Sequence, residues 1–501
     1  MLKSIPLLAY ILLSHHLLMA QQNFSRIYDL EKDGLLLGYQ VVDYDSSLFV
    51  LTGKICLNPD RQCGDIVKMD LQGNIIWQRE IGSFDIGNTN SVWIVNDTIT
   101  ITGHRNSMDQ PFGFFMQQMT VDGDSLTNYV FPVDTSLVGN AFNYGTAYIE
   151  NGWYLYGTGR AVDASVDAIL MQINRKGELV NTKYWDDGFN AVQPADLQQR
   201  SDGSLILLVE TEDFGEIDAK RQLVELDEDL NRQYLWNSPL AANLGVINNC
   251  VKLNDNRMAM IAPNTNLGLA NEAPFIHFVD EVNIEYSRYE FDFEIGVDIR
   301  RFTSNLIAAN NGDLIGVGNY RSVLEKETGY MYRISKEGEM LWETTYRHED
   351  WDTGGQLINQ LNDIVELEDG SLLAVGWQDE TTENQSLQDL WLIRVGPDGC
   401  LYEDDCDFGQ FTTSTNNESN ESENRFPLFY PNPTSDRIFF DEGVLPQSRL
   451  EIYSSAGEKV IEFKGVIPQG YVSLDNLVSG MYILKFTSPD LQHQYRKIIV
   501  D

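Results

Sequence analysis

Positive charge is scarce in this chain. Among its 501 residues, 35 are Lys or Arg and 75 are Asp or Glu, which gives a formal net charge of −40. A nucleic-acid-binding surface needs clustered basic side chains that neutralise phosphates, so nucleic acid is excluded as a partner. The same shortage argues against tight binding to an anionic membrane surface.

Histidine and long apolar runs are also scarce. The chain has six His, and none of them falls in an H-x-x-x-H or H-E-x-x-H pattern that would indicate a zinc site. The nucleophile elbow of α/β-hydrolases, the nucleotide-binding glycine fingerprints and the EF-hand loop are absent as well. After residue 20 no run of about 18 apolar residues occurs, so we expect no transmembrane span in the mature chain.

Residues 1–20 have the layout of a secretory signal peptide. Lys3 is followed by a mostly apolar stretch over 5–19, and the small residue Ala20 precedes a polar segment. A membrane-anchoring helix is the alternative, but the stretch is short and His15 and His16 interrupt it. The sequence therefore predicts a secreted protein whose mature chain begins after Ala20.

Cysteine is rare, and its placement suits an oxidising compartment. Cys56 and Cys63 enclose one short loop, and Cys400 and Cys406 enclose another, so we predict a disulfide in each loop. A metal site is the alternative, but these spacings are not those of zinc ligands. The fifth cysteine, Cys250, is predicted to be a buried thiol.

A repeat organises the middle of the chain. A turn followed by a short apolar run recurs, and its turn residues, 50 to 58 positions apart, are 47, 97, 152, 203, 256, 312 and 370. Each copy is followed by an alternating strand, a polar turn and another strand. In the first copy Val67, Met69 and Leu71 share one face, which is the period of a half-buried strand.

These signals predict about four short antiparallel strands in each unit. Seven such units over residues 21–406 predict an all-β domain, a β-propeller of about seven blades. The two middle copies (203–236 and 256–291) lack a glycine in the turn between their last two strands, so six or eight blades are alternatives. Residues 24–31 resemble a lone outer strand, and we expect them to complete the seventh blade and close the ring.

The repeats also resemble the secreted β-propeller repeat proteins of bacteria of the Bacteroidetes type. The matching residues over 26–406 are Asp65, Gly73, Trp77, Gly338, Trp342, Asp389, Trp391 and Gly399. This resemblance implies a fold but no activity. Trp77 and Trp342 stand where quinone-binding propellers carry Trp, but we interpret them as blade-packing residues.

The last part of the chain differs in composition. Residues 407–425 are polar and repetitive, which predicts a flexible linker, with a glycan-bearing stalk as the alternative. Residues 426–501 carry short strands expected at 437–440, 449–453, 458–464, 471–474, 481–487 and 495–500. They predict a small C-terminal β-sandwich.

Residues 426–501 resemble the type A C-terminal sorting domain of type IX (Por) secretion. The residues that carry the resemblance are Tyr430, Pro431, Asn432, Pro433, Gly457, Leu477, Gly480, Tyr482 and Lys497, together with Ile452-Tyr453 and the terminal Ile498-Ile499-Val500. The resemblance implies recognition by the type IX secretion machinery and passage across the outer membrane. It also implies that the cargo is either released or tethered to the cell surface.

Carboxylates are the abundant candidates for chemistry in the propeller. They cluster at 210–218, 289–298 and 348–352, and Trp351 and Trp377 could stack on sugar rings. A glycosidase needs two carboxylates across a cleft, whereas acidic runs are usually solvated surface. No cofactor is predicted, and a calcium site in these loops would have no supporting spacing.

The sequence favours a secreted or cell-surface propeller that binds an unknown protein or glycan without catalysis. Loops on both faces of such a ring suit recognition. The alternative is a secreted carbohydrate-active enzyme that uses paired carboxylates near the propeller channel. The sequence assigns no catalytic, cofactor-binding or metal-binding residue.

Overall fold

The protein forms two compact units, Met1–Glu403 and Asp404–Asp501, in a computed structural model of the chain. The structure describes residues 23–401 and 429–500 with gaps, and these gaps are 31–35, 56–61, 83–84, 87–89, 106–111, 150–151, 162–165, 186–190, 213–219, 238–249, 254–256, 265–272, 281–285, 291–298, 323–326, 348–357, 383–384, 431–436, 441–448, 455–458, 465–470, 475–476, 479 and 488–492. The predicted signal peptide (1–20) and linker (407–425) lie outside the described residues. Within the described part, no helix has the length and apolar content needed to cross a membrane.

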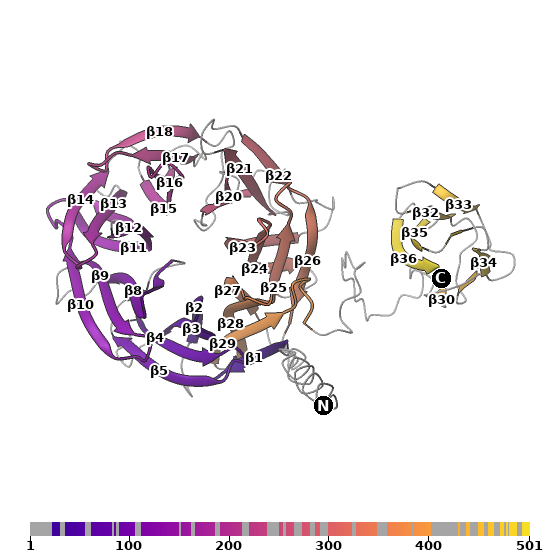
Figure 1. The fold of residues 1–501 in the computed structure, drawn as a ribbon, viewed down its shortest axis with the longest axis horizontal. Coiled ribbons are helices and arrows are strands. Elements are labelled where there is room, and N and C mark those ends of the chain that lie inside the picture. Colours follow the sequence, from indigo (N-terminus) through magenta and orange to yellow (C-terminus); the bar gives the residue numbers. More distant parts are fainter. Residues whose placement is uncertain are drawn as a thin grey trace, which may run out of the picture. The chain divides into compact units, whose positions relative to one another are not determined.

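The first unit is a ring of seven antiparallel sheets, or blades, numbered here in chain order (Figure 1). From the inner strand outward, blade 1 consists of β2 (Leu36–Tyr44), β3 (Ser47–Ile55), β4 (Gln62–Asp70) and β5 (Ile75–Gly82). Blade 2 consists of β7 (Val92–Val95), β8 (Thr98–Arg105), β9 (Gly113–Thr120) and β10 (Ser125–Pro132). Blade 3 consists of β11 (Val138–Ile149), β12 (Gly152–Ala161), β13 (Val166–Asn174) and β14 (Leu179–Trp185). The short strand β6 (Asp85–Ile86) also pairs with β8 in blade 2.

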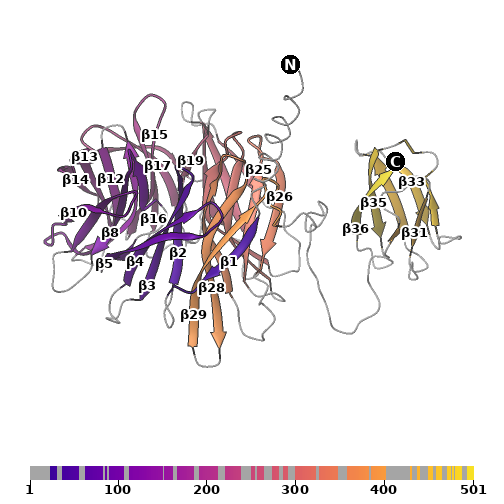
Figure 2. The same ribbon diagram turned by 60° about the horizontal axis from the view of Figure 1, so that its bottom comes forward.

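The remaining blades follow the same plan. Blade 4 consists of β15 (Ala191–Gln199), β16 (Leu205–Glu212), β17 (Lys220–Leu226) and β18 (Arg232–Asn237), and blade 5 of β19 (Cys250–Lys252), β20 (Arg257–Asn264), β21 (Ala273–Asp280) and β22 (Tyr286–Glu290). Blade 6 consists of β23 (Ile299–Ala308), β24 (Leu314–Ser322), β25 (Thr328–Ile334) and β26 (Met340–Tyr346). Blade 7 consists of β27 (Ile358–Glu366), β28 (Leu372–Thr382), β29 (Gln385–Val395) and β1 (Phe24–Tyr28). Blades 3 and 4 are linked by one parallel pair, Val166 with Ala191. The prediction of seven blades is confirmed. At one face of the ring, β28 and β29 extend beyond the neighbouring strands (Figure 2).

The second and third strands of the blades bury both of their faces, because each blade packs between two others. In β28, Leu372 and Ala374 pack toward blade 6, whereas Leu373 and Val375 pack toward blade 1. This arrangement explains why the second strands have continuous apolar runs rather than strict alternation. At roughly 1.5–3 kcal/mol for each fully buried aliphatic side chain, these interfaces are the main stabilising term of the ring.

Strand β1 closes the ring, as predicted. It pairs antiparallel with β29, from Phe24 opposite Arg394 to Tyr28 opposite Leu390. The Trp391 indole Nε1 of blade 7 donates a hydrogen bond to Ser25 Oγ at 2.9 Å. The Tyr28 hydroxyl donates to the Gly73 carbonyl of blade 1 at 2.7 Å. Residues near the start of the chain therefore join the last blade to the first.

Turn glycines are covered by aromatic side chains of the preceding blade. Gly73, with φ +80°, would place a Cβ 2.5 Å from Tyr28 Oη, and Gly399, with φ +79°, would place one 2.8 Å from the Trp342 ring. Gly123 lies in the same way near Trp77. Trp77 and Trp342 therefore pack between blades, as predicted. Blade 4 has no glycine at this turn, and Leu230 adopts φ 59° there instead.

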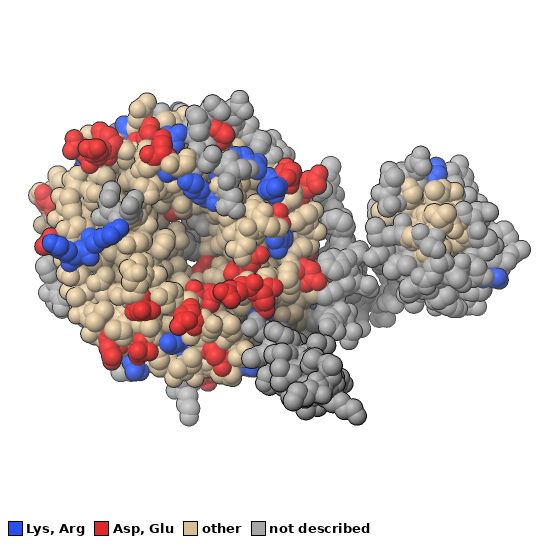
Figure 3. Space-filling view, in the orientation of Figure 1, with Lys and Arg blue, Asp and Glu red and all other residues tan. Residues whose placement is uncertain are grey.

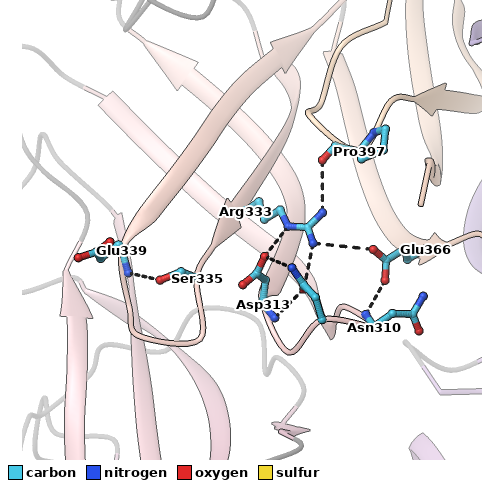
Figure 4. Close-up of polar contacts among 8 residues, drawn as sticks. Asn310, Asp313, Arg333, Ser335, Glu339, Glu366 and Pro397 are labelled. Atoms are coloured by element: carbon cyan, nitrogen blue, oxygen red, sulfur yellow. Dashed lines mark hydrogen bonds and ion pairs between the residues drawn. The ribbon is translucent and has the colours of Figure 1, made fainter. Parts of the chain in front are cut away.

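Cationic side chains add a second link between blades 6, 7, 1 and 2. Arg333 is buried, pairs with Asp313 at 2.9 Å, and donates to the Pro397 carbonyl of blade 7 at 3.3 Å (Figure 4). At the equivalent positions Arg394 donates to Leu71 O at 2.8 Å, and Lys68 donates to Val121 O at 3.1 Å. Each cation reaches the outer turn of the next blade. Arg257 of blade 5 likewise donates to the Lys336 carbonyl in the outer turn of blade 6 at 2.5 Å, so such links are not confined to the part of the ring where the chain closes it.

The second unit contains two small sheets. One sheet is β30 (Phe429–Tyr430), β31 (Arg437–Phe440) and β34 (Tyr471–Ser473), and the other is β33 (Lys459–Lys464), β32 (Arg449–Ser454), β35 (Gly480–Thr487) and β36 (His493–Val500). Val472 of the first sheet shares a core with Ile452 and Leu484 of the second. The predicted β-sandwich and its strands are therefore confirmed, with β30 as an additional short strand.

The structure tests one of the cysteine predictions. Cys250 is a buried thiol, as expected. Cys56 and Cys406 lie outside the described residues, so the disulfides Cys56–Cys63 and Cys400–Cys406 stay predictions.

Ring closure through Gly73 can be tested by Gly73→Ala. We expect it to lower the free energy of unfolding by roughly 2–4 kcal/mol, because an alanine there is strained at positive φ and displaces Tyr28 of β1. Urea unfolding followed by tryptophan fluorescence measures the loss. Gly203→Ala is the matched control: its φ is +89°, but the nearest atom to its Cβ lies at 4.0 Å, so only the cost of the backbone strain, about 1–2 kcal/mol, applies. Equal losses in the two variants would contradict the closure role of β1.

Candidate functional site

A polar residue interrupts the apolar inner strands of several blades. Five inner strands carry a β-bulge at the same height, where one extra residue is inserted opposite the second strand. In four of them the residue after the bulge is Gln40, Asp196, Asn305 or Asp363, and each of these side chains is buried. Buried groups of this kind require hydrogen-bond partners, and they find them on neighbouring blades.

Asp363 links three blades. Its Oδ2 accepts a hydrogen bond from the backbone N–H of Val41 in blade 1 at 2.8 Å. Its Oδ1 accepts one from the Asn305 side-chain amide of blade 6. The adjacent Asn362 amide donates to the Gly38 carbonyl at 2.6 Å, so blade 7 holds the bulge of blade 1 from both sides.

Asp196 has the equivalent role on blade 4. Its Oδ2 accepts from the backbone N–H of Cys250 in blade 5 at 2.8 Å, and its Oδ1 accepts from the Tyr156 hydroxyl of blade 3 at 3.1 Å. Gln198 donates to the Cys250 carbonyl at 2.9 Å. On blade 1, the Gln40 side-chain oxygen accepts from the backbone N–H groups of Ser91 and Val92 of blade 2 at 2.7 and 2.9 Å.

Burial raises the pKa of Asp196 and of Asp363 to about 6 in each case. A raised carboxyl pKa is one property of a general acid, so by this criterion both residues are catalytic candidates. Glycoside hydrolysis needs two carboxyl groups roughly 5–10 Å apart across a cleft. Asp196 and Asp363 belong to blades 4 and 7, and their oxygens accept hydrogen bonds from neighbouring blades. Their geometry is that of structural links.

The predicted carboxylate clusters lie mostly outside the described residues, at 213–219, 291–298 and 348–352, and so does Trp351. Glu210 is buried in β16, and Trp377 is half-buried in β28. The residues that the structure describes contain no group of three or more His, Cys, Asp or Glu placed to hold a metal ion. Acidic side chains gather beside the centre of the ring, over β27, on the face shown in Figure 3.

The inner-strand polar residues were not recognised in the sequence. The available signal is an Asp, Asn or Gln directly before the apolar residues of a first strand, as in Asp363-Ile364-Val365 and Asn305-Leu306-Ile307. A single polar residue in an apolar strand does not by itself reveal which neighbour satisfies it, because that neighbour is some 50 residues or more away in the chain.

The predicted sorting residues of the second unit divide by environment. Leu477 and Tyr482 pack into its core, and the Tyr482 hydroxyl donates to the Val478 carbonyl at 2.8 Å. Gly480 begins β35, and a Cβ there would meet no atom closer than 3.8 Å. Tyr430 lies in β30 and Lys497 in β36. Pro431, Asn432, Pro433 and Gly457 lie outside the described residues.

Comparison with known proteins identifies the second unit. Residues 428–501 match the family described as Secretion system C-terminal sorting domain (Por_Secre_tail). The match confirms the sorting domain predicted at the end of the chain. No curated protein matches the chain.

Solved structures resemble the chain only distantly. A protein of unknown function from Dyadobacter fermentans is 11% identical with a TM-score of 0.39, covering 63% of this chain and 95% of that chain. The β-propeller domain of the Trilobed protease from Pyrococcus furiosus is 10% identical with a TM-score of 0.42, covering 75% and 98%. The GH93 alpha-L-arabinofuranosidase of Fusarium graminearum is 12% identical with a TM-score of 0.40, covering 76% and 99%. These similarities carry no conclusion about ligand or activity.

The fold and the family match together define a secreted β-propeller protein with a C-terminal sorting domain. The terminal domain is that of the Por, or type IX, secretion system. Such a domain implies interaction with the type IX machinery and export across the outer membrane, to the cell surface or the medium.

The two inner carboxylates predict an unusual pH dependence. Each holds its proton more strongly in the native state than in the unfolded chain, whose carboxyl pKa is about 3.9. Their contribution to stability is therefore full below pH 4 and is lost as pH rises through 6, about 3 kcal/mol for each group. We expect the urea midpoint of the propeller to be higher at pH 5 than at pH 7.5.

The matched variant for this prediction is Asp363→Asn, which does not titrate. It should reduce the change in unfolding free energy between pH 7.5 and 5 by roughly half, whatever its absolute stability, while Asp202→Asn on an exposed turn should leave that change intact. A propeller that loses stability on going from pH 7.5 to 5 would contradict the assignment.

Proposed function

We propose that this protein is an exported, non-enzymatic propeller that binds a protein or a glycan. The observation that carries the proposal is the combination of a closed ring of seven blades with a sorting domain that directs it out of the cell. A closed ring presents many loops from one rigid scaffold, which suits recognition of an external ligand.

The buried charged residues of the ring form hydrogen bonds between blades, which supports the binding role. Asp363, Asp196, Arg333 and Arg394, which would otherwise be candidates for chemistry, all bind groups of neighbouring blades. Their removal would therefore weaken the ring rather than remove an activity.

The export role is tested by deleting residues 426–501 in a host that carries type IX secretion. The propeller should then accumulate in the periplasm, because the segment that the machinery recognises is gone. Cell fractionation followed by immunoblotting measures the distribution. Normal appearance of the truncated protein at the surface or in the medium would contradict the export role.

The binding role is tested by exposing the secreted protein to a glycan panel and to surface proteins of neighbouring cells. We expect saturable binding with no change in the ligand. The alternative, a carbohydrate-active enzyme, has a distinct result: sugar release that disappears when one carboxylate within 210–218, 289–298 or 348–352 is changed to its amide. That result would replace the binding proposal.

A further inference from the structure

The interface between blades 6 and 7 changes from apolar to polar along its strands. The two blades are neighbours in the ring (Figure 1). Most of the interface is one apolar core, which includes Met331 of blade 6 and Leu361 and Trp391 of blade 7. Gly329 of blade 6 allows a close approach there, because a Cβ at this residue would lie 2.6 Å from the Trp391 ring. Beyond this layer the facing strands carry polar residues.

Asn359 and Gln378 of blade 7 are neighbours in this polar layer. Asn359 of β27 lies directly opposite Gln378 of β28 in the antiparallel ladder. Gln378 is on the same face of β28 as Leu372 and Ala374, which pack toward blade 6. Residues directly opposite in such a ladder point to the same side, so both amides face blade 6. In agreement, the Asn359 backbone N–H donates to the carbonyl of Glu327, directly before β25, at 3.0 Å.

Both side chains are sealed from solvent and carry unpaired polar atoms. Asn359 is 0% exposed and Gln378 is 6% exposed. Among the residues that the structure describes, none forms a hydrogen bond with Oδ1 or Nδ2 of Asn359, or with Oε1 of Gln378. Native proteins pair nearly all buried groups of this kind, because an unpaired one opposes folding. Three such atoms on two neighbouring side chains therefore indicate a bound molecule.

The fold itself does not require an amide at position 359. Asn359 lies three residues before the extra residue of the β-bulge in its inner strand. The same position in blades 1, 3 and 4 is occupied by Leu36, Ala141 and Val192, and all three are buried. An apolar side chain thus fits this place in the repeat. The asparagine adds a hydrogen-bonding group that packing alone does not explain.

The unpaired atoms define the chemistry of the bound molecule. Asn359 Oδ1 and Gln378 Oε1 each require a donor, whereas Asn359 Nδ2 requires an acceptor. A cation would satisfy only the two oxygens, and an anion would satisfy only the Nδ2 group. A neutral hydroxyl compound both donates and accepts. Because both side chains are sealed from the surface, the smallest such molecule, water, suits the site best.

The charges beside this layer also favour a neutral molecule. Glu327 Oε2 accepts a hydrogen bond from Asn319 Nδ2, and its Oε1 pairs with Arg321, both at 3.4 Å. Asp389, opposite Gln378 on β29, is half-buried. A bound cation would compete with Arg321 for Glu327, whereas water leaves this ion pair unchanged. The part of the chain that the structure describes has no group of three or more His, Cys, Asp or Glu placed for a metal here.

We propose that Asn359 and Gln378 hold bound water inside the interface of blades 6 and 7. One water molecule donates to Asn359 Oδ1 and to Gln378 Oε1, and the same molecule or a second one accepts from Asn359 Nδ2. The water is a structural part of the ring, since it pairs atoms that the closed interface withholds from solvent. The site does not depend on which ligand the propeller binds.

The direct test is a high-resolution crystal structure of the secreted chain. We expect an ordered water molecule within hydrogen-bond distance of both amides. Electron density in which the two amides bond only to each other or to other side chains, without water, would overturn the inference. Electron density for a metal ion or an organic molecule at this place would overturn it as well.

A solution measurement counts the same water. Water ¹⁷O relaxation dispersion detects buried molecules that exchange slowly, and we expect about one or two fewer in the double variant Asn359→Leu with Gln378→Met than in the parent. Asn128→Leu, at an exposed position of β10, is the matched control and should leave the count unchanged. If the double variant does not fold, Gln378→Met alone replaces it and should lower the count or shorten the residence time. An unchanged count and residence time in a folded variant would contradict the proposal.

Thermal unfolding separates water from a cation and tests the pairing of the two residues. Asn359→Leu alone should lower the midpoint by roughly 2–5 °C, because it leaves the Gln378 amide in the interface with fewer partners. Adding Gln378→Met should restore part of this loss, and a double variant that melts below the single one would contradict the pairing. Calcium or a chelator should not shift the midpoint of the parent. A calcium-dependent shift that the double variant lacks would overturn the inference in favour of a cation site.

Discussion

The hydrogen bonding of three inner strands to the backbone of the next blade is the constraint on which this ring depends. Apolar packing between blades is strong but has no direction, so it does not by itself fix the height of one inner strand relative to another. The side chains of Gln40, Asp196 and Asp363 do so, because each accepts backbone N–H groups of the following blade. These residues stand beside β-bulges, which turn one polar side chain sideways without breaking the rest of the strand.

Links at the outer turns add to the inner ones, both around the closure and between blades 5 and 6. Between blades 6, 7, 1 and 2 the inner polar links are joined by Arg333, Arg394 and Lys68 at the outer turns, and by β1 itself. The last blade depends on a strand from the start of the chain, so its loss would free an entire edge of β29. The strands β27, β28 and β29 are joined to β1 without a direct chain connection, so these links oppose the opening of the ring at this junction.

The sequence predicted the repeating elements well because each is a local pattern. Apolar runs with turn glycines located the blades, and even blade 4, where Leu230 replaces the glycine, kept its spacing. The lone strand at 24–31 could be assigned to closure because a repeat missing one strand demands it. The hydrogen-bond partners of Asp196 and Asp363 could not be predicted, because they depend on which residues of another blade lie level with these side chains. The C-terminal motif was predictable as a family pattern, but its sequence did not reveal which of its residues are buried.

That last distinction changes the meaning of the sorting motif. In the segment Leu477-Val478-Ser479-Gly480-Met481-Tyr482, residues that pack in the core stand next to a residue that does not. Leu477 and Tyr482 are held by the core, while Val478 is exposed on a segment they immobilise. The buried residues of the motif thus have a structural role within the domain, and the structure shows which side chains have it.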